Sequence, residues 1–535
     1  MISVEKIPFE QVPQFSDRDV AYVTNDERLR PFYKYPVTLD AFAEVFKDKT
    51  KDQTDRATLV KVLKKQYLPI AASPATLKNI EALEQDNTFT VITAHQPSLF
   101  TGPLYYIYKI ISTINLARQL NERYPDYHVV PVFITGGEDH DFEEVQKANI
   151  FNKTLVWENE ESGSVGAMKT DTLQPVLSEL KDLLGQSPHA VEIYQLMEEA
   201  YSENKIYANA TIQMVNSLFG KDGLLVVGMN DADLKRGFIP IMTEELLQQS
   251  SCELVEETSN QLNEAGFKTQ AAPREINLFY LRDQIRERIV FDEGNYHVLN
   301  TDYKFSETEL LAEVNQHPEH FSPNVVMRPL YQELTFPNLA YIGGGGELAY
   351  WLERKTQFAH FKINYPMLIR RNSVLWLDPS MHKMMDKLDL KVADIFVETE
   401  SLIKVFLKRI SDEPLHLKPE KEQLDKMFNN IAERIKLIDP TLEATVKAEG
   451  ARQIKSLENM EGRLMRAEKQ KHDIAVNQIR AIKDKLFLNN GLQERRDNFL
   501  SFYVKYGPEF FETLKRELDP MDKRFVVIVD RADQG

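Results

Sequence analysis

Three short apolar runs, each followed at once by polar and glycine residues, limit the folds open to this chain of 535 residues. They lie at residues 88–94, 129–134 and 223–231, and a further strand is expected at 366–378. The first run precedes a segment, 104–124, whose apolar residues recur near helical spacing. Short apolar strands that alternate with helices are typical of a mostly parallel sheet covered on both faces. The sequence therefore predicts an α/β core.

The composition divides the chain into four parts. We expect 1–86 to be a mainly helical segment that packs on the core. The core follows at 87–380, with a small antiparallel β-rich insertion at about 268–304. From 381 to 491, lysine, glutamate, leucine and isoleucine dominate and glycine is sparse, which is typical of long helices. The last part, 492–535, is expected to return to the core.

The helical part has apolar residues at heptad spacing. One seam contains Leu424, Met427, Ile431 and Ile438, and a second contains Leu457, Met460, Leu464, Ala467 and Ile474. Asp439, Pro440 and Thr441 interrupt the helix between the seams, and Thr441 can cap the next helix. Two long helices joined by a tight turn are expected to pack as an antiparallel coiled-coil hairpin.

Charge and cysteine content exclude several classes of function. The chain has 82 acidic and 65 basic residues, and a net charge of −17 repels phosphate backbones, so no nucleic-acid partner is expected. The single cysteine, Cys252, excludes an intrachain disulfide and a multi-thiolate zinc site, and no paired histidine marks it as a nucleophile. Neither a signal peptide nor a spanning apolar run is found, so we expect a cytoplasmic protein without a membrane partner.

The run HQPSLFTGP at 95–103 follows the first strand and precedes a helix. In parallel sheets, ligands bind beyond the carboxyl ends of the strands, and a helix N-terminus favours phosphate. We expect His95 and Gln96 to hold phosphate oxygens or a carboxylate, with His95 stabilising charge during nucleotidyl or acyl transfer. The other candidate binding residues of this run are Ser98, Thr101 and Gly102. The alternative is an ordinary strand-to-helix loop with a surface histidine.

The run GGEDHDF at 136–142 follows the second strand. Glu138 and Asp139 can orient an amine, and together with His140 they are candidate catalytic residues. Asp141 is a candidate binding residue, although an aspartate at this place is also common as a helix cap. Ligands that are adjacent in sequence seldom converge on one ion, so no metal is expected.

Four consecutive glycines precede a probable helix, and they are Gly343, Gly344, Gly345 and Gly346. Such a run lets the backbone approach a ligand closely and adopt positive φ. Glu347, which follows, can bind an ammonium group or hydroxyls. The run is not a P-loop, because no Gly-Lys-Ser/Thr follows it. A flexible loop without a ligand is the alternative.

The run RPLYQE supplies four more candidate binding residues, which are Arg328, Tyr331, Gln332 and Glu333. Arg328 can hold a carboxylate with two parallel hydrogen bonds. A structural salt bridge explains the arginine equally well. For Arg370 and Arg371 the structural interpretation is favoured, because successive strand residues face opposite sides of a sheet.

Several of these segments together resemble a known family. Residues 93–117, 131–145, 322–333, 337–353 and the tail at 492–511 are similar to the cysteine-adding enzymes of bacillithiol biosynthesis, the BshC family. The similarity runs nearly end to end and includes the coiled coil. It implies a Rossmann-like core related to class I aminoacyl-tRNA synthetases, connecting-peptide insertions and a coiled coil that helps form a homodimer.

The resemblance also implies a reaction. A ligase of this family attaches cysteine, or an activated cysteine donor, to the amino group of glucosaminyl-malate, which is the last step of bacillithiol biosynthesis. ATP or ADP is the expected nucleotide. The H-x-G-H and K-M-S-K-S signatures of class I synthetases are absent from the sequence, so their adenylation mechanism is not carried over residue by residue.

Charge complementarity adds to this hypothesis. Glucosaminyl-malate carries two carboxylates and an amine, so Lys109 or Arg328 can hold the former, and Glu138, Asp139 or Glu347 can receive the latter. Two alternatives stay open. The chain can be another nucleotide-dependent amide-forming or nucleotidyl-transfer enzyme, or a non-catalytic, nucleotide-binding dimeric scaffold.

Overall fold

The computed structural model describes residues 2–411 and 413–531 and divides into two compact units. One unit contains the residues up to Glu5, Trp376–Leu492 and the residues from Val527. The other contains Lys6–Leu375 and Gln493–Val526. Among the described residues, no helix combines the length and the apolar character needed to cross a bilayer.

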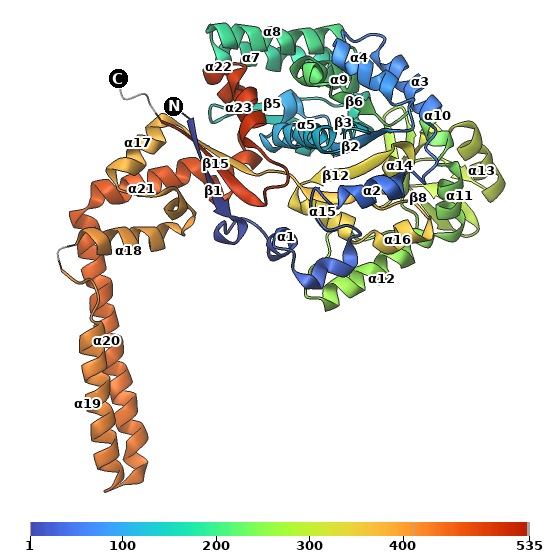
Figure 1. Ribbon diagram of the computed structural model, residues 1–535. Coiled ribbons are helices and arrows are strands. Elements are labelled where there is room, and N and C mark those ends of the chain that lie inside the picture. The colour runs from blue at the N-terminus through green and yellow to red at the C-terminus, as the bar shows by residue number, and fades with distance from the viewer. Residues whose placement is uncertain (1, 412, 532–535) are drawn as a thin grey trace. The chain divides into compact units, whose positions relative to one another are not determined.

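The larger unit is built on a parallel sheet of five strands, which Figure 1 shows surrounded by helices. The strands are β2 (Thr88–His95), β3 (His128–Thr135), β6 (Leu225–Gly228), β12 (Asn338–Gly343) and β13 (Met367–Arg370). Their order is β13-β12-β2-β3-β6, and each neighbouring pair is parallel. Counted along the chain this is the 3-2-1-4-5 order of a Rossmann-like fold. The prediction of a parallel α/β core is therefore confirmed.

Apolar side chains of the strands and helices form the core of this unit. The strands are buried along nearly their whole length, as their apolar sequences predict. One cluster joins Phe89 and Val91 of β2 to Phe42 and Phe46 of helix α2 (Phe42–Lys49). The same cluster includes Leu116 of helix α5 (Tyr105–Arg123), so the sheet and two of its helices share one core.

Helices connect and extend the strands. The first part of the chain has β1 (Ile2–Pro8), α1 (Asp17–Val23), α2, α3 (Arg56–Tyr67) and α4 (Pro74–Ala82), so it begins with a strand that helical periodicity does not predict. The helices that follow are α6 (Phe142–Val145), α7 (Gln174–Leu184), α8 (Pro188–Glu203), α9 (Tyr207–Phe219), α10 (Ala232–Arg236), α11 (Ile239–Gln248) and α12 (Ser250–Glu264). After them come α13 (Glu307–Gln316), α14 (Arg328–Thr335), α15 (Gly345–Leu352) and α16 (Lys355–His360), with α22 (Leu500–Tyr506) and α23 (Glu509–Glu517) near the C-terminus.

An antiparallel sheet is inserted between α12 and α14. Its strands are β7 (Leu278–Arg282), β8 (Ile285–Asp292), β9 (Asn295–Val298), β10 (Lys304–Phe305) and β11 (Phe321–Pro323), in the order β10-β9-β8-β7-β11. A separate hairpin pairs β4 (Lys147–Ile150) with β5 (Lys153–Val156).

The expected single strand at 366–378 is wrong. The segment forms two strands, β13 and β14 (Val374–Leu377), which belong to different sheets. The chain changes direction between them at Arg371, Asn372 and Ser373, whose side chains are buried in polar contacts. Strand β14 pairs instead in a three-stranded sheet of order β1-β15-β14, where β15 (Arg524–Asp530) comes from the C-terminal part of the chain.

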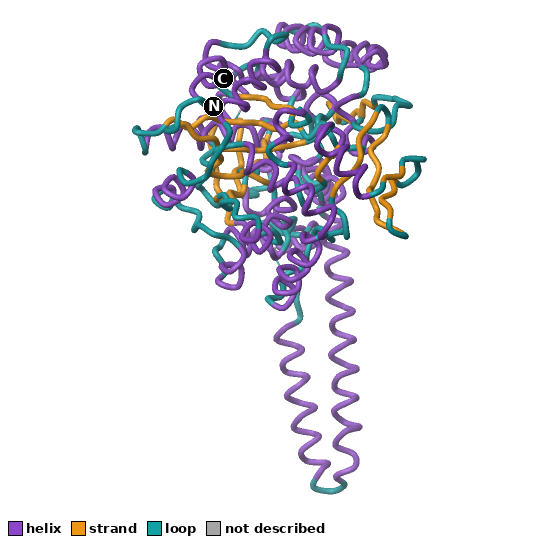
Figure 2. Tube along the Cα trace, turned by 90° about the vertical axis from the view of Figure 1, so that its right-hand side faces the viewer, coloured by secondary structure: helices purple, strands orange, loops and turns teal. Residues whose placement is uncertain are grey.

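The smaller unit contains the predicted helical hairpin. Helices α19 (Lys418–Lys436) and α20 (Glu443–Lys471) lie side by side and antiparallel, joined by a short turn (Figure 2). The other helices of this unit are α17 (Pro379–Lys387), α18 (Thr399–Ile410) and α21 (Asp473–Leu486). Asp439, rather than the expected Thr441, caps the turn, because its carboxylate accepts a hydrogen bond from the Thr441 backbone N–H at 2.9 Å.

Only part of the predicted seam faces the partner helix. Leu424, Ile431 and Leu457 are half-buried, whereas Met427 and Ile438 are 47% and 86% exposed. Met427 is exposed because the next residue, Phe428, takes the second position of the repeat, and Ile438 lies beyond the end of α19. Phe428, outside the predicted seam, packs against Gly450 of α20.

Gly450 and Gly462 lie on the same helix and predict opposite effects of alanine. A Cβ at Gly450 would approach the Phe428 Cβ to 2.8 Å, so Gly450→Ala should lower the free energy of unfolding of the hairpin despite alanine's higher helix propensity. A Cβ at Gly462 meets nothing within 4 Å, so Gly462→Ala should raise that free energy by about 1 kcal/mol or less. Chemical unfolding followed by circular dichroism measures both, and two changes of the same sign would contradict the packing.

Candidate functional site

The strand order creates a crevice at one end of the central sheet. Strand β2 lies between β3 and β12 in the sheet. The chain first adds β3 and β6 on one side of β2 and later adds β12 and β13 on its other side, so the direction of winding reverses at β2. In such sheets the ligand crevice lies beyond the carboxyl ends of the two strands where the winding reverses. His95 ends β2, and Gly343 ends β12 directly before helix α15.

A cavity of about 630 Å³ occupies this position. His95, Asp139 and Glu347, which belong to three segments far apart in the sequence, all line it. The other predicted residues that line the cavity are Gln96, Glu138, Arg328, Tyr331, Gly344 and Gly346. The cavity lies within the larger unit and also receives residues of the β-rich insertion and of the C-terminal segment.

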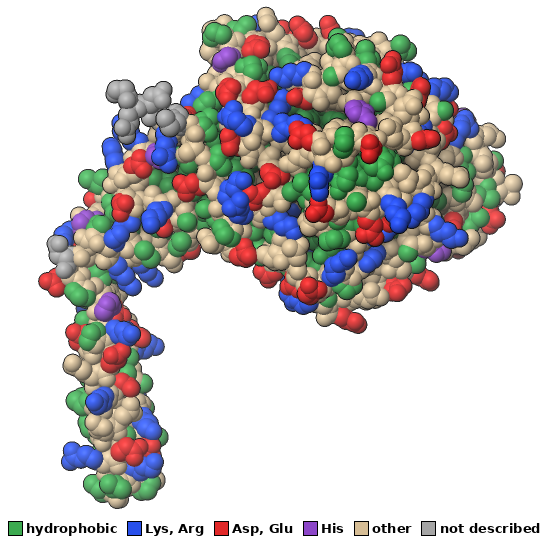
Figure 3. Space-filling model, in the orientation of Figure 1, with side chains coloured by type: hydrophobic (Ala, Val, Ile, Leu, Met, Phe, Trp, Pro, Cys, Tyr) green, Lys and Arg blue, Asp and Glu red, His purple; other side chains and the backbone are tan. Residues whose placement is uncertain are grey.

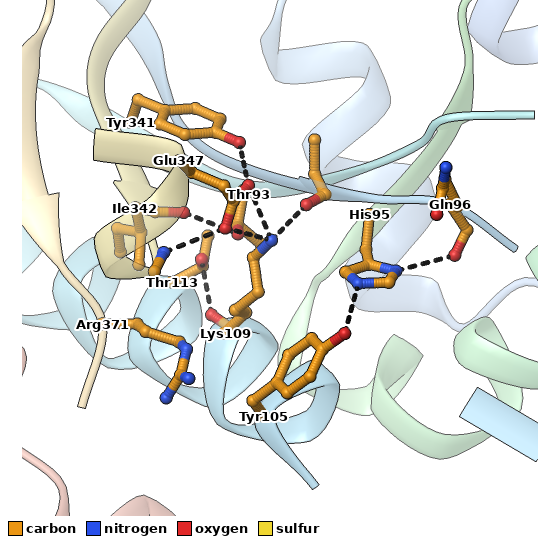
Figure 4. Close-up of polar contacts among 12 residues, drawn as sticks. Thr93, His95, Gln96, Tyr105, Lys109, Thr113, Tyr341, Ile342, Glu347 and Arg371 are labelled. Carbon is orange, nitrogen blue, oxygen red and sulfur yellow. Dashed lines mark hydrogen bonds and ion pairs between the residues drawn. The ribbon is translucent and has the colours of Figure 1, made fainter. Parts of the chain in front are cut away.

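A buried ion pair lies beside the cavity (Figure 4). Lys109 of α5 is 1% exposed, and its Nζ lies 2.7 Å from Oε2 of Glu347. Glu347 also accepts hydrogen bonds from the Tyr341 hydroxyl at 2.6 Å and from the Gly344 N–H at 2.9 Å. Burial disfavours its charge, but Lys109 and these donors outweigh burial and lower the pKa of Glu347 to about 2.

This pair alters two expected roles. The Lys109 ammonium is shared between Glu347 and the Ala94 carbonyl, so it is not the free cation expected to hold a substrate carboxylate. Glu347 is likewise satisfied by partners of its own chain. The two groups fix the shape and the charge of this side of the cavity.

His95 is held as a neutral imidazole. Its Nδ1 lies 3.0 Å from the Gln96 carbonyl, which only accepts, so Nδ1 carries the proton and Nε2 accepts from the Tyr105 hydroxyl at 3.0 Å (Figure 4). Burial and the nearby Lys109 charge lower the pKa of His95 to about 4. Burial also raises the pKa of Tyr105 to about 12. Both shifts oppose proton transfer from the hydroxyl to the imidazole, so the two groups form a neutral hydrogen-bonded pair beside the cavity.

Asp139 is a fixed anion beside the cavity. Its carboxylate accepts from the Gln96 side chain at 2.6 Å and from the His140 N–H at 2.7 Å, and Arg286 Nη1 lies 3.5 Å away. Burial opposes its ionisation, but hydrogen bonds with His140 and Gln96 and the Arg286 charge lower its pKa below the usual range. The His140 ring is half exposed and contacts Arg286.

Two neighbouring acids differ in role. Glu138 lines the cavity and pairs with Lys235 of α10, whose Nζ is 3.0 Å away and fully buried. Asp141 is exposed and accepts from the Glu144 N–H at 3.3 Å, so the helix-cap interpretation describes it. Glu144 itself lines the cavity, and burial together with Asp141 and Asp139 raises its pKa.

Arg328 supplies a cation to the cavity. It begins α14 and donates to the Tyr350 hydroxyl at 2.6 Å and to Gln332 Oε1 at 3.3 Å. Within residues 2–411 and 413–531 it has no carboxylate partner in an ion pair, so the salt-bridge alternative finds no support. Arg370 and Arg371 instead pair with Asp19 and Glu494 at 2.8 and 2.7 Å, as the structural interpretation predicts, although Arg371 also lines the cavity.

The expected phosphate cradle at Ser98, Thr101 and Gly102 is not formed. All three residues are buried and outside the cavity lining. Asn498 donates to the Gly102 carbonyl at 2.7 Å, and the N–H groups of Gly102 and Leu104 donate to the carbonyls of Leu99 and Asp497. The backbone donors that would bind phosphate are therefore already used by the chain.

Other expected contacts are also replaced by contacts within the chain. Gln332 and Glu333 are buried and bond to each other at 2.8 Å, away from the cavity. None of the four glycines from Gly343 to Gly346 has positive φ, which corrects that expectation. Gly345 is required for another reason, because a Cβ there would collide with the Asp19 carboxylate.

Several residues that line the cavity are not predicted from the sequence. They are Tyr105, Glu144, Arg286, Asn324, Tyr350 and Arg495. Tyr105 and Glu144 lie a few residues beyond the runs that attract attention, so a wider window would include them. Arg286 and Arg495 come from the insertion and the C-terminal segment, and no local pattern indicates that these segments reach the crevice. Cys252 does not line it, and burial raises the pKa of its thiol.

Comparison with known proteins identifies relatives over the whole chain. Residues 2–372 match the model "Bacillithiol biosynthesis BshC, N-terminal Rossmann-like domain", and residues 374–529 match "Bacillithiol biosynthesis BshC, C-terminal coiled-coil domain". A protein of Flavobacterium johnsoniae named "Putative cysteine ligase BshC" is 42% identical, covering 98% of this chain and 99% of the relative. Proteins with the same name from Christiangramia forsetii and Cytophaga hutchinsonii are 39% and 34% identical, covering 98% and 97% of each chain.

Among solved structures, a Campylobacter jejuni chain titled as a "putative arginyl t-RNA synthetase" is similar at 12% identity. The alignment covers 83% of this chain and 98% of that chain, with a TM-score of 0.22, which is too low to support an argument. The relation of the core to class I synthetases therefore stays a prediction.

The lowered pKa of His95 predicts a pH dependence of stability. The imidazole has a pKa of about 4 when folded and an ordinary value of 6.5. Between these values the unfolded chain binds more protons, so the free energy of unfolding should fall as the pH falls through this window and gain no further slope from His95 below it. Denaturant unfolding of the wild type and of His95→Asn measures this difference, and parallel pH profiles would show that His95 is not held neutral.

Proposed function

The chain belongs to the BshC family of bacillithiol biosynthesis, and from this premise we propose that it is the ligase that joins cysteine to the amino group of glucosaminyl-malate. The observation that carries the proposal is the presence of unlike charges around one cavity. Arg328 brings a cation that has no carboxylate partner among the residues that the structure describes, and Asp139 brings a fixed anion. A substrate with two carboxylates and an amine needs both.

Arg328 is the residue assigned to a malate carboxylate. Its guanidinium can form two parallel hydrogen bonds with a carboxylate, a geometry that a lysine lacks. Arg495 is exposed at the same cavity and can approach the second carboxylate. Arg371 is less suited, because Glu494 already accepts from both of its terminal nitrogens at 3.0 and 2.7 Å.

The substrate amine is assigned to the acidic side chains of the cavity, Asp139 and Glu144. Asp139 stays ionised and can accept a hydrogen bond from an ammonium group, as can Glu144 beside it. An ammonium nitrogen must lose a proton before it attacks a carbonyl carbon. Glu144 is assigned to receive that proton, because burial raises its pKa and makes it a stronger base than His95, whose pKa is lowered to about 4.

Forming the amide requires an activated cysteine carboxyl group, because the condensation of a free carboxylate and an amine in water is uphill. ATP is proposed as the source of activation. The residues expected to hold its phosphates, Thr101 and Gly102, do not fit this role, because they are buried and their backbone groups bond to the chain. No catalytic step is therefore assigned to the nucleotide at that segment.

Replacing Arg328 tests the substrate assignment. In a bacillithiol-producing bacterium whose own copy of this gene has been deleted, so that the thiol is lost, the wild-type chain should restore it, as measured by labelling and mass spectrometry. Arg328→Ala should lower the rate of formation at least tenfold, since it removes charge-assisted hydrogen bonds worth about 1.5–3 kcal/mol. Arg236→Ala, which removes an arginine outside the cavity lining, is the matched control and should restore the thiol fully.

The proposal is contradicted if the wild-type chain accumulates in these cells without restoring bacillithiol. It is equally contradicted if Arg328→Ala restores bacillithiol as fast as Arg236→Ala at the same protein level.

We further propose that two copies of the chain associate through the helical hairpin. Leu437 and Ile438, at the turn between α19 and α20, are 88% and 86% exposed, and Met460 and Leu464 are about half exposed. Figure 3 shows hydrophobic side chains gathered at this end of the hairpin. Exposed apolar patches of this kind are typical of association surfaces.

Charged substitutions at the turn test this association. The double variant Leu437→Glu, Ile438→Glu should be monomeric in multi-angle light scattering at concentrations where the wild type is dimeric, because two carboxylates would have to be buried in the dimer. Leu68→Glu, at an exposed leucine of the other unit, should leave the dimer intact. A wild type that is monomeric, or a double variant that is dimeric, would contradict the proposal.

A further inference from the structure

The turn after helix α13 brings two histidines and a glutamate together, outside the cavity lining. His317 ends the helix, and Glu319 and His320 lie on the short 3-10 turn that follows Pro318. His317 Nδ1 lies 3.2 Å from Glu319 Oε1, and His320 Nε2 lies 3.9 Å from the same oxygen. One ligand atom from each residue lies within 4.8 Å of the others.

We propose that His317, Glu319 and His320 form a binding site for a divalent transition-metal ion, with zinc as the best fit. Zinc bonds to imidazole nitrogen and carboxylate oxygen at about 2.0–2.2 Å, so two of its tetrahedral ligands lie about 3.3 Å apart. The distances from Glu319 Oε1 to His317 Nδ1 and His320 Nε2, 3.2 and 3.9 Å, lie within about 0.6 Å of that separation. Two nitrogens and one oxygen suit zinc, whereas calcium and magnesium prefer oxygen ligands alone.

A carboxylate behind His320 orients it for this role. His320 Nδ1 lies 2.7 Å from Oε1 of Glu313, and the same oxygen accepts from the Tyr280 hydroxyl at 2.7 Å. A carboxylate accepts, so Nδ1 carries the proton, and Nε2 keeps the lone pair that can bind a metal. Metal-binding histidines are commonly held in this way, by a carboxylate on the nitrogen that does not bind the metal.

Glu319 provides a second, independent indication. Its Oε2 is buried and has no hydrogen-bond partner among the described residues. The oxygen that faces the two imidazoles is the other one, Oε1, and a cation bound to this carboxylate would lower the cost of leaving Oε2 without a hydrogen bond. The side chain as a whole is 32% exposed, so an ion can reach it from solvent.

Arg282 is the competitor for the site. Its Nη1 lies 2.9 Å from Nε2 of His320, so it uses the lone pair that a metal would bind. The arginine is exposed and can move into solvent when an ion binds. Removing this side chain should therefore strengthen metal binding, an effect that a purely structural role for the histidines does not predict.

The site is connected to the cavity through the next residue. The Phe321 carbonyl accepts from Lys235 Nζ at 2.8 Å, and Lys235 pairs with Glu138 at 3.0 Å. A bound ion would hold the turn that positions this carbonyl. The role that follows is to steady the Lys235–Glu138 pair rather than to take part in the chemistry.

Zinc titration of the full-length, metal-free protein tests the proposal. Isothermal titration calorimetry should show one equivalent of zinc per chain, and cobalt substituted at the site should give the visible absorption of a tetrahedral complex. His317→Ala and His320→Ala should weaken binding at least tenfold. Glu313→Gln should weaken it by about 10–100-fold, as for other groups that orient a ligand. Arg282→Ala should strengthen binding severalfold.

Two controls keep the test decisive. His360→Ala removes an exposed histidine paired with Glu244 on other helices, and it should leave zinc binding unchanged. His317 is about half exposed, so His317→Ala carries the test if His320→Ala fails to fold. Zinc should raise the melting temperature of the wild type and of His360→Ala, but not that of His317→Ala. Absence of zinc binding by the wild type, or equal binding by the wild type and His317→Ala, would overturn the proposal.

Discussion

The buried ion pair between Lys109 and Glu347 is the interaction on which the rest of the site depends. It joins helix α5, which follows the first strand of the sheet, to helix α15, which follows the fourth. These two helices flank the place where the winding of the sheet reverses. Removing one partner of such a pair leaves an uncompensated buried charge, which costs about 3–5 kcal/mol. The pair therefore holds helices α5 and α15 together at the crevice and also determines the charge on this side of it.

The electrostatics of the cavity follow from this pair. The Lys109 charge contributes to the low pKa of His95, which stays neutral, while Glu347 is held ionised and satisfied. Arg328 is then a cavity cation without a carboxylate partner among the described ion pairs, and Asp139 is an anion fixed from the neighbouring strand. A ligand with both a carboxylate and an amine fits a cavity with these separate charges, which connects the geometry to the family's amide-forming chemistry.

The sequence predicts the parts of this structure that local chemistry determines. Residues 88–94 and 129–134 become buried strands because they contain no charged residue and are rich in apolar and β-branched side chains, and Asp139 and Glu347 reach the cavity because polar residues after parallel strands meet at one edge. The heptad pattern predicts the hairpin but not its contact face, since Gly450 admits Phe428 where the heptad places no residue.

Most of the sequence-based predictions that the structure contradicts fail because of contacts between segments that lie far apart in the chain. Asn498 lies nearly 400 residues from Gly102, yet it determines that the loop before α5 is buried rather than open to phosphate. Arg371 divides an expected strand in two because Glu494 binds its guanidinium. Arg286 reaches the cavity on the β-rich insertion, and no pattern near it in sequence indicates where that insertion folds.

The most direct test of whether the cavity beyond β2 and β12 is the reaction centre is a crystal structure of the full-length protein with glucosaminyl-malate bound. The malate carboxylates should lie within hydrogen-bonding distance of the Arg328 guanidinium, and the amine should face Asp139 and Glu144. Substrate density at any place outside the cavity beyond β2 and β12 would contradict the account.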